Sequence, residues 1–157
     1  MTTREIPPAP GRVLVTGGAG FIGSHFVDHL LAEYPGFKIT VLDKLTYAGS
    51  VDNLPMADIE FVYGDVCNAA LVDKLVARCT HVVHFAAETH VTRSIAENRL
   101  FFETDVIGTQ TVLNACLEHR EKIRGIIHVS TSEVYGTARL ALGEKMDEGH
   151  ALAPMSP

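Results

Sequence analysis

The sequence predicts an α/β fold in which a doubly wound parallel sheet carries helices on both faces. Five short apolar runs, rich in Val and Ile, alternate with segments long enough to form helices, which is typical of parallel strands joined by helical crossovers. These runs occupy residues 12–16, 38–42, 59–63, 80–85 and 124–129. Most of them are continuous rather than alternating in polarity, as expected for strands that helices cover on both sides.

The chain has the size and composition of one globular domain. Its 157 residues can bury about 70% of the surface that the unfolded chain exposes. Hydrophobic residues make up 46% and charged residues 20%, which is a globular composition. The net charge of −6 argues against a nucleic-acid partner, because proteins that bind a phosphate backbone usually present a basic face.

The cysteines and the N-terminal segment indicate a cytoplasmic protein. Cys67, Cys79 and Cys116 are widely spaced and odd in number, so we expect buried thiols in a reducing compartment and no disulfide or metal site. Residues 1–11 lack the apolar core of a signal peptide, and no apolar run approaches the roughly 20 residues of a membrane span. We expect a flexible tail over 1–11, one domain over 12–157, and no membrane partner.

The first predicted strand leads into a glycine turn that indicates a nucleotide-phosphate site. Residues 13–23, VLVTGGAGFIG, carry Gly17, Gly20 and Gly23 directly after an apolar run. We expect Gly17 to permit the turn, Gly20 to let the backbone approach a pyrophosphate, and Gly23 to let helix and strand pack closely. Backbone N–H groups and the helix dipole would then face the phosphates. A glycine turn alone also fits an ordinary strand-to-helix connection.

Two helices stand out between the strands. The first is expected from about residue 20 to residue 34, before Pro35 and Gly36. Its apolar residues recur at helical spacing and would pack on the sheet; they are Phe21, Ile22, Phe26, Leu30 and Leu31. The second and longest is expected from residue 94 to residue 119, with an apolar side formed by Phe102, Val106, Leu113 and Leu117.

Asp43 ends the second strand about twenty residues beyond the glycine turn. A carboxylate at this position accepts hydrogen bonds from an adenosine ribose in dinucleotide-binding domains. Taken alone, Asp43 also fits a turn residue at the end of a strand. Together with the glycines it predicts a Rossmann fold, and a preference for NAD over NADP because a carboxylate repels a 2′-phosphate.

The residues after the other strands are candidates for the site, because ligands of an open parallel sheet bind beyond the carboxyl ends of its strands. After the third strand, Asp65 precedes Val66; its carboxylate fits an acceptor for the adenine amino group and equally a helix N-cap. After the fourth strand, the small residues of FAAETHVTRS, 85–94, would let a dinucleotide pass close to the backbone. His90, in that segment, fits a cleft residue or an exposed loop residue.

The fifth strand delivers hydroxyl groups and one carboxylate to the same edge, in the run from Ser130 to Tyr135. A hydroxyl group can orient a substrate oxygen, and a carboxylate in a partly dry cleft can exchange a proton. Turn chemistry is the alternative for a run rich in Ser and Thr. His81 and His84 lie three apart in the predicted fourth strand, so their side chains should point to opposite faces and cannot share a metal.

Together these motifs resemble the extended short-chain dehydrogenase/reductase family that modifies nucleotide sugars, with the dTDP-glucose 4,6-dehydratases the most similar group. The motifs are VTGGAGFIGSH, VLDKLTYAG, GDV, HFAAETHVTRSI, TDVIGT and VSTSEVYG, and the resemblance covers nearly all of residues 12 to 135. The resemblance implies NAD as cofactor and a dTDP- or other NDP-hexose as substrate. The implied cofactor residues are Gly17, Gly20, Phe21, Ile22, Gly23, Asp43, Lys44, Asp65, Val66, Phe85, Ala86, Ala87 and Thr104.

The resemblance also implies a reaction and an assembly. NAD would take a hydride from C4 of the sugar, water would leave across C5 and C6, and the hydride would return to C6. Thr131 would hydrogen-bond the 4-oxygen, and Glu133 would remove the C5 proton, which is acidic only once C4 is a ketone. Relatives commonly dimerise through a four-helix bundle that includes the helix at about residues 94–118, which implies a homodimer.

The sequence departs from the family pattern at three places. Ser132 stands where the dTDP-glucose enzymes carry an Asp that protonates the departing hydroxyl, and the Thr-Ser-Glu order is similar to GDP-mannose 4,6-dehydratases and UDP-glucuronate decarboxylases. Asp105 stands where many relatives have Asn. Tyr135 is not the tyrosine of the family's YxxxK motif, because Arg139 and not a lysine stands four residues later. That motif should instead follow a Ser-Pro pair similar to Ser156 and Pro157. We expect an inactive part that precedes this motif and the substrate domain.

Other functions remain compatible with the residues. Within the same family, a nucleotide-sugar 4-epimerase or a UDP-glucuronate decarboxylase would share the cofactor site. A non-catalytic NAD-binding sensor or scaffold is the alternative outside enzymes. The presence or absence of a tyrosine followed four residues later by a lysine separates these two classes.

Overall fold

Five parallel strands form one sheet in the order β3-β2-β1-β4-β5. The computed structural model describes residues 11–137 and 145–156, so most of the expected tail, Arg139 and Pro157 lie outside the described residues. The strands are β1 (Arg12–Thr16), β2 (Lys38–Asp43), β3 (Ile59–Tyr63), β4 (His81–His84) and β5 (Gly125–His128). The predicted strands and the doubly wound sheet are therefore confirmed, with ends that differ by at most one residue.

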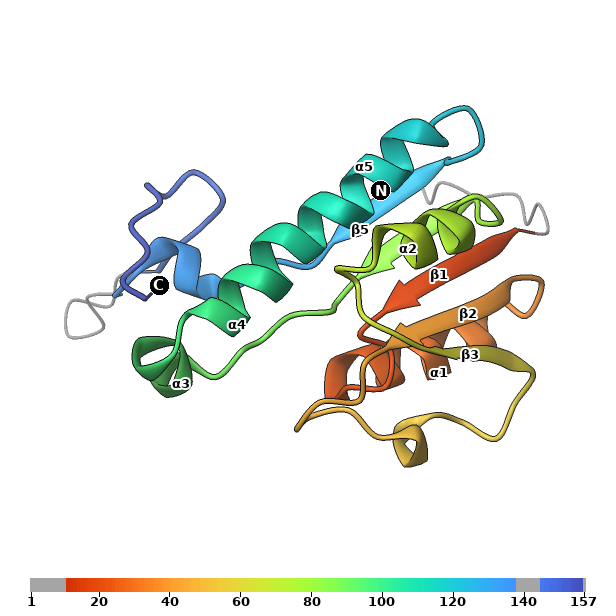
Figure 1. Cartoon of the computed structure of the whole chain (residues 1–157), viewed down its shortest axis with the longest axis horizontal. Coiled ribbons are helices and arrows are strands. Elements are labelled where there is room, and N and C mark those ends of the chain that lie inside the picture. Colours follow the sequence, from red (N-terminus) through yellow and green to blue (C-terminus); the bar gives the residue numbers. More distant parts are fainter. Residues whose placement is uncertain (1–10, 138–144, 157) are drawn as a thin grey trace.

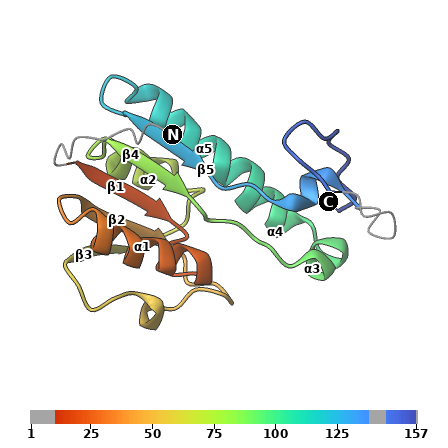
Figure 2. The ribbon, with the colours of Figure 1, turned by 180° about the vertical axis from the view of Figure 1, so that it is seen from behind.

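Helices cover both faces of this sheet, as Figures 1 and 2 show. Helix α1 (Phe21–Glu33) lies on one face, where Val27 and Leu30 pack with residues of β1 and β2. Helices α2 (Ala69–Val76) and α5 (Thr109–Glu118) lie on the other face and share a core with Leu14 and Leu42. Strands β1, β2 and β4 are largely buried because their side chains face one of these two helical layers. In β5, by contrast, Ile126 and Ile127 are 43% and 55% exposed.

Between β3 and β4 the chain crosses from the β3 edge of the sheet to the far side of β1, where β4 pairs with β1. Strand β1 pairs with β2 on one side and with β4 on the other, so the connections after β1 and β4 diverge at its carboxyl end. Such a point in a parallel sheet leaves a crevice beyond the strands, where ligands bind. The remaining short elements are η1 (Val51–Asn53), α3 (Val91–Ala96), α4 (Arg99–Phe101), the π-helical η2 (Phe102–Gly108) and η3 (Ser132–Tyr135).

The apolar stripe predicted for α1 is wrong at its first two positions. Phe21 and Ile22 are 75% and 64% exposed, and the face that packs on the sheet is formed by Gly23, Val27 and Leu30. The first turn of α1 extends past the carboxyl end of β1, so its apolar side chains line the cleft described below. Phe26 and Leu31 pack at the border of the core, as expected.

The long helix predicted from residue 94 to residue 119 is divided. Helix α3 ends at Ala96, and Glu97 adopts an extended backbone with φ −148° and ψ 93°. A new helix runs without interruption through α4, η2 and α5, seen as one long rod in Figure 1. The π-helical stretch in its middle, around Asp105, has wider turns than an α-helix, a feature frequently found at functional sites.

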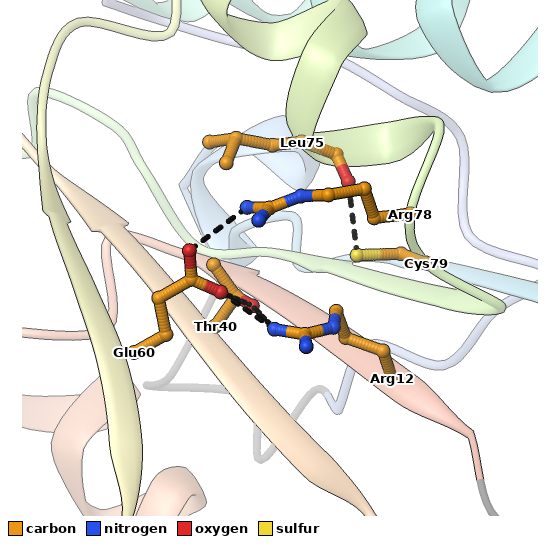
Figure 3. A network of polar contacts seen from close by, with 6 residues as sticks. All are labelled: Arg12, Thr40, Glu60, Leu75, Arg78 and Cys79. Carbon is orange, nitrogen blue, oxygen red and sulfur yellow. Dashed lines mark hydrogen bonds and ion pairs between the residues drawn. The ribbon is translucent and has the colours of Figure 1, made fainter.

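At the amino ends of the strands, polar side chains form a fully paired network, drawn in Figure 3. Arg12 Nη1 donates to Glu60 Oε2 at 2.5 Å and to Thr40 Oγ1 at 3.0 Å, and Arg78 Nη2 donates to Glu60 Oε1 at 3.0 Å. The network joins β1, β2 and β3 to the chain after α2. Burial acts to raise the pKa of Glu60, but the hydrogen bonds and charges of its partners outweigh this effect and lower the pKa.

No helix among residues 11–137 and 145–156 combines the length and apolar character needed to cross a membrane. Cys67, Cys79 and Cys116 are free thiols; Cys79 and Cys116 are buried as expected, whereas Cys67 is only partly buried because it lies in the loop between β3 and α2. Burial raises the pKa of each of them to about 11. Side chains of His81 and His84 face opposite sides of the sheet as predicted, since His81 contacts Phe37 and His84 contacts Thr109.

Candidate functional site

A cleft of about 620 Å³ lies at the carboxyl ends of the strands. This volume is within the range of pockets that hold cofactors and small ligands. Every residue that the sequence implied for the cofactor lines this cleft: Gly17, Gly20, Phe21, Ile22, Gly23, Asp43, Lys44, Asp65, Val66, Phe85, Ala86, Ala87 and Thr104. Thr131 and Glu133 line it as well, whereas Ser132, between them in the chain, is not part of the lining.

The glycine turn after β1 requires glycine at two of its three glycine positions, Gly17 and Gly23. Gly17 has φ +69°, and a Cβ atom there would lie 2.5 Å from the backbone N of Ala86. A Cβ atom on Gly23 would lie 2.2 Å from the carbonyl oxygen of Gly17. At Gly20, by contrast, a Cβ atom would meet only that oxygen, at 3.4 Å, because this residue faces the cleft. The turn thus brings bare backbone to the first turn of α1, where a helix dipole favours an anion.

Asp43 ties the glycine turn to β2. Its Oδ2 atom accepts a hydrogen bond from the backbone N–H of Ala19 at 2.9 Å, and its Oδ1 atom accepts one from Leu45 at 2.8 Å. Leu45 has φ 53° and is the one non-glycine residue with positive φ in the described part of the chain. A carboxylate oxygen has capacity for a second hydrogen bond, so Asp43 fixes the loop and keeps acceptor sites toward the cleft.

Lys44 and Asp65 form an ion pair across the ends of β2 and β3, with Nζ and Oδ2 2.5 Å apart. The hydrogen bond to Asp65 raises the pKa of Lys44. Burial acts to raise the pKa of Asp65, but hydrogen bonds from Lys44 and from the N–H of Cys67 lower it overall. Asp65 is not the N-cap of α2, because Asn68 occupies that position, so its carboxylate remains part of the cleft wall.

His84 connects three elements beneath the cleft. Its Nδ1 atom lies 2.6 Å from Thr16 Oγ1 and its Nε2 atom 3.0 Å from Thr109 Oγ1, while its ring stacks on His128 at 5.3 Å. Burial, together with the charge of His128, lowers the pKa of His84 to about 4. The imidazole is therefore neutral near pH 7, with one ring nitrogen donating and the other accepting. Thr16 Oγ1 also accepts the Ala86 N–H at 3.4 Å.

Two carboxyl groups that the sequence did not assign to the cofactor also line the cleft. Glu88 is only 6% exposed, and its backbone N–H donates to Asp105 Oδ1 at 2.8 Å. Burial raises the pKa of both Glu88 and Asp105. The position of Asp105 in the π-helical segment is thus explained by its hydrogen bond, in which an Asn oxygen would serve equally well.

The strand-five run forms a turn rather than an extension of β5. Thr131 is the N-cap of η3, and its Oγ1 atom accepts a hydrogen bond from the N–H of Glu133 at 3.1 Å. Thr131, Ser132 and Glu133 are all exposed. The chain brings two of these three groups to the cleft through a hydroxyl-capped turn, so the turn and site interpretations of this run are compatible.

The loop after β2 and the segment after β4 contact each other beside the cleft through exposed side chains. Tyr47 Oη lies 3.2 Å from Thr89 Oγ1, and Arg93 lies over the Tyr47 ring at 5.0 Å. His90 is exposed and does not line the cleft. Among the further lining residues, Thr89 and Ser94 lie in the 85–94 segment expected near the dinucleotide, and Ser156 lies in the expected Ser-Pro pair. Thr46 and Thr109 also line the cleft but were given no role, because no periodicity or spacing marks them.

The fold and the cleft define the class of doubly wound Rossmann domains with a glycine turn at the first crossover. Within this class the chain belongs to the GDP-mannose 4,6 dehydratase family, whose profile matches residues 14–157.

Individual relatives agree with this assignment. A dTDP-glucose 4,6-dehydratase of Actinoplanes sp. is 46% identical over 155 residues, which cover 93% of this chain and 47% of the relative. The crystal structure of DesIV, a dTDP-glucose 4,6-dehydratase from Streptomyces venezuelae with NAD bound, superposes with a TM-score of 0.84 at 46% identity, covering 92% of this chain and 46% of that one. A UDP-glucose 4-epimerase from Thermus thermophilus with NAD has a TM-score of 0.82 at 36% identity, with coverage of 92% and 45%. The chain spans about half the length of the curated relatives it matches.

Proposed function

We propose that this chain is the cofactor-binding part of an NAD-dependent nucleotide-sugar 4,6-dehydratase. The observation that carries the proposal is a single cleft lined both by the glycine turn with Asp43 and by Thr131 with Glu133. A dinucleotide site and groups suited to a sugar hydroxyl and a proton share one space. Similarity to dTDP-glucose 4,6-dehydratases over 93% of the chain supports the same reaction.

The residues of the cleft fit NAD. Gly20 faces the cleft, where a Cβ atom would meet only the Gly17 oxygen at 3.4 Å, so phosphates can approach bare backbone and the start of α1. Gly17 and Gly23 permit the tight turn that presents this backbone. Asp43 offers carboxylate oxygens to a ribose diol, and its charge disfavours a 2′-phosphate. Asp65, at the end of β3, suits the adenine amino group. When bound, NAD would accept a hydride from C4 of the sugar and return it to C6.

Thr131 and Glu133 have distinct tasks in this proposal. The Thr131 oxygen already accepts the N–H of Glu133, which leaves its own proton free to bond the 4-oxygen of the sugar. The Glu133 carboxylate removes the C5 proton once C4 is a ketone. Ser132 does not line the cleft, so we assign it no contact with the sugar. The tyrosine and lysine of the YxxxK motif, and a substrate domain, would belong to the complete enzyme.

We propose that the complete enzyme is a homodimer. We also propose that it is located in the cytoplasm, because free thiols are typical of a reducing compartment. One side of the helix from residue 99 to residue 118 carries apolar residues that are at least 45% exposed: Phe102, Val106, Leu113 and Leu117. Exposed apolar surface of this kind marks interaction sites. Light scattering of the complete enzyme should give twice the mass of one chain, and a monomer would contradict the dimer.

Binding and product analysis test the proposal separately. Calorimetric titration of this chain should detect binding of NAD, and NADP should bind at least about tenfold more weakly because of the Asp43 carboxylate. Equal affinity for the two cofactors would contradict the role of Asp43. If neither cofactor binds, the cofactor assignment is overturned. Mass spectrometry of the complete enzyme with a panel of NDP-hexoses should show loss of water. An unchanged mass would indicate an epimerase, and loss of carbon dioxide a decarboxylase.

A further inference from the structure

The buried Glu88 carboxyl group has an oxygen atom, Oε2, that accepts no hydrogen bond from the described residues. The side chain follows β4, lines the cleft and is buried, yet Oε2 has no hydrogen-bond partner in residues 11–137 or 145–156. The neighbouring carboxylates are different, because Asp43 accepts two backbone N–H groups and Asp65 accepts Lys44 and a backbone N–H. Buried polar atoms nearly always have a partner, so an exception calls for one that the protein alone does not supply.

The nearby cations are bound elsewhere. The positive charges of Lys44 and Arg93 act on the Glu88 carboxyl group, but the Lys44 ammonium pairs with Asp65 and the Arg93 guanidinium lies over the ring of Tyr47. The nearest titratable group of the long helix is Asp105, whose Oδ1 atom is occupied by the N–H of Glu88. The Glu88 carboxyl group is therefore held in place by its backbone and left without a donor.

The missing partner must be a hydrogen-bond donor without negative charge. A phosphate group would be repelled by Glu88 and by Asp105 alike, since both are acids in a partly dry cleft. A hydroxyl group has the required chemistry, because it donates to a carboxylate in a strong, charge-assisted hydrogen bond. The ribose rings of a dinucleotide present such hydroxyl groups on either side of the pyrophosphate.

We propose that Glu88 is a binding residue of the cleft, whose carboxyl oxygen accepts a hydrogen bond from a ribose hydroxyl of the bound dinucleotide. This inference rests on the proposed function, since it presumes that NAD occupies the cleft. It adds a second acidic contact to that of Asp43 and places it after β4.

Calorimetry on variants of the chain tests this contact. Glu88→Leu should weaken NAD binding by about tenfold or more, as expected for loss of a charge-assisted hydrogen bond. Glu88→Gln keeps an acceptor oxygen and should lose less, about threefold. Glu97→Gln, which removes a carboxylate from an exposed position outside the lining, should bind NAD with unchanged affinity. Native affinity in Glu88→Leu would overturn the proposal, whereas failure of the unmodified chain to bind NAD would instead refute the proposed function.

Two further measurements identify the ribose and exclude a merely structural role. If a hydroxyl of the adenosine ribose is the donor, Glu88→Leu weakens the binding of ADP, ADP-ribose and NAD by the same factor. If a hydroxyl of the second ribose is the donor, Glu88→Leu leaves the binding of ADP unchanged. The melting temperature of the ligand-free Glu88→Leu chain should be equal to or above that of the unmodified chain, because an apolar side chain replaces an unpartnered acid. A lower melting temperature together with an equal loss for ligands that carry no ribose, such as pyrophosphate, would show a structural role and overturn the proposal.

Discussion

At the amino ends of the strands, Glu60 accepts hydrogen bonds from Arg12, Thr40 and Arg78, whereas at the carboxyl ends Glu88 holds a buried oxygen without a described partner. The same sheet thus carries a satisfied carboxylate at one end and an unsatisfied one at the other. Saturated hydrogen bonds contribute to stability. Unsatisfied groups persist where a ligand completes them, so the two ends of the sheet serve the fold and the site respectively.

The backbone shows the same division between the two ends. The turn at the carboxyl end of β1 holds Gly17 at φ +69° and brings Gly23 against a carbonyl oxygen. Leu45, beside Asp43, adopts φ 53°. Unusual backbone conformations of this kind concentrate at binding sites, where the surrounding structure maintains them. Changes at the carboxyl end should therefore disturb binding, and changes at the amino end should disturb stability alone.

The largest effect is expected for Gly23→Ala. The added Cβ atom would lie 2.2 Å from the Gly17 carbonyl oxygen and 2.8 Å from Gly18 Cα, and both are backbone atoms that cannot move away without opening the turn. We expect a loss of about 3 kcal/mol in the free energy of unfolding and no measurable binding of NAD. Urea denaturation and calorimetry measure the two quantities.

Gly36→Ala is the matched control, because a Cβ atom there would meet nothing within 4 Å. It should leave binding unchanged and stability within about 1 kcal/mol of the unmodified chain. A Gly23→Ala chain that binds NAD normally would show that the turn does not depend on close backbone contact.

Acidification should weaken the carboxyl end through His84. The pKa of His84 is lowered to about 4 from 6.5, so the unfolded chain takes up the proton first and stability falls as the pH drops from about 6.5 through 4. A shift of this size corresponds to about 3 kcal/mol, present in full above pH 6.5. Urea denaturation at a series of pH values measures the slope.

Variants of two histidines isolate this contribution. His84→Gln should be less stable at pH 7, because Thr16 and Thr109 lose their partner, and should show a flatter decline below pH 6.5. His29→Gln, at an exposed position of α1, should keep the slope of the unmodified chain. If His84→Gln declines as steeply as the unmodified chain, other groups control the acid response.

The sequence predicted the sheet and most of the cleft because both depend on local patterns. Continuous apolar runs marked the five strands, and the spacing from Gly17 to Asp43 marked a dinucleotide site. The family resemblance implied the remaining cofactor residues, and all of them line one cleft. Exposure of Phe21 was not predictable from periodicity, since helical spacing does not reveal where α1 extends past the sheet. The significance of Glu88 depends on which atoms lie around its carboxyl group, and Glu97 interrupts the long helix without a Gly or Pro signal.

The smallest effect is expected at the amino end, for Glu60→Gln. The substitution removes a charge that two guanidinium groups share, but the Glu60 side chain is 37% exposed, and ion pairs so near solvent contribute about 1 kcal/mol or less. Because these partners lower the pKa of Glu60, its contribution is present above its ordinary pKa of 4.5 and lost as the pH falls through the lower folded value. Stability should therefore decrease slightly at pH 7, and less so in 1 M salt, which screens the pair.

NAD affinity decides whether the two ends are independent. Glu60 lies near the start of β3, and the cleft lies beyond its end, so calorimetry should give Glu60→Gln the affinity of the unmodified chain, as for Glu97→Gln. A change of more than about threefold, or about 0.7 kcal/mol, would mean that the paired network at the amino ends also sets the geometry of the cleft, through the strands that join them.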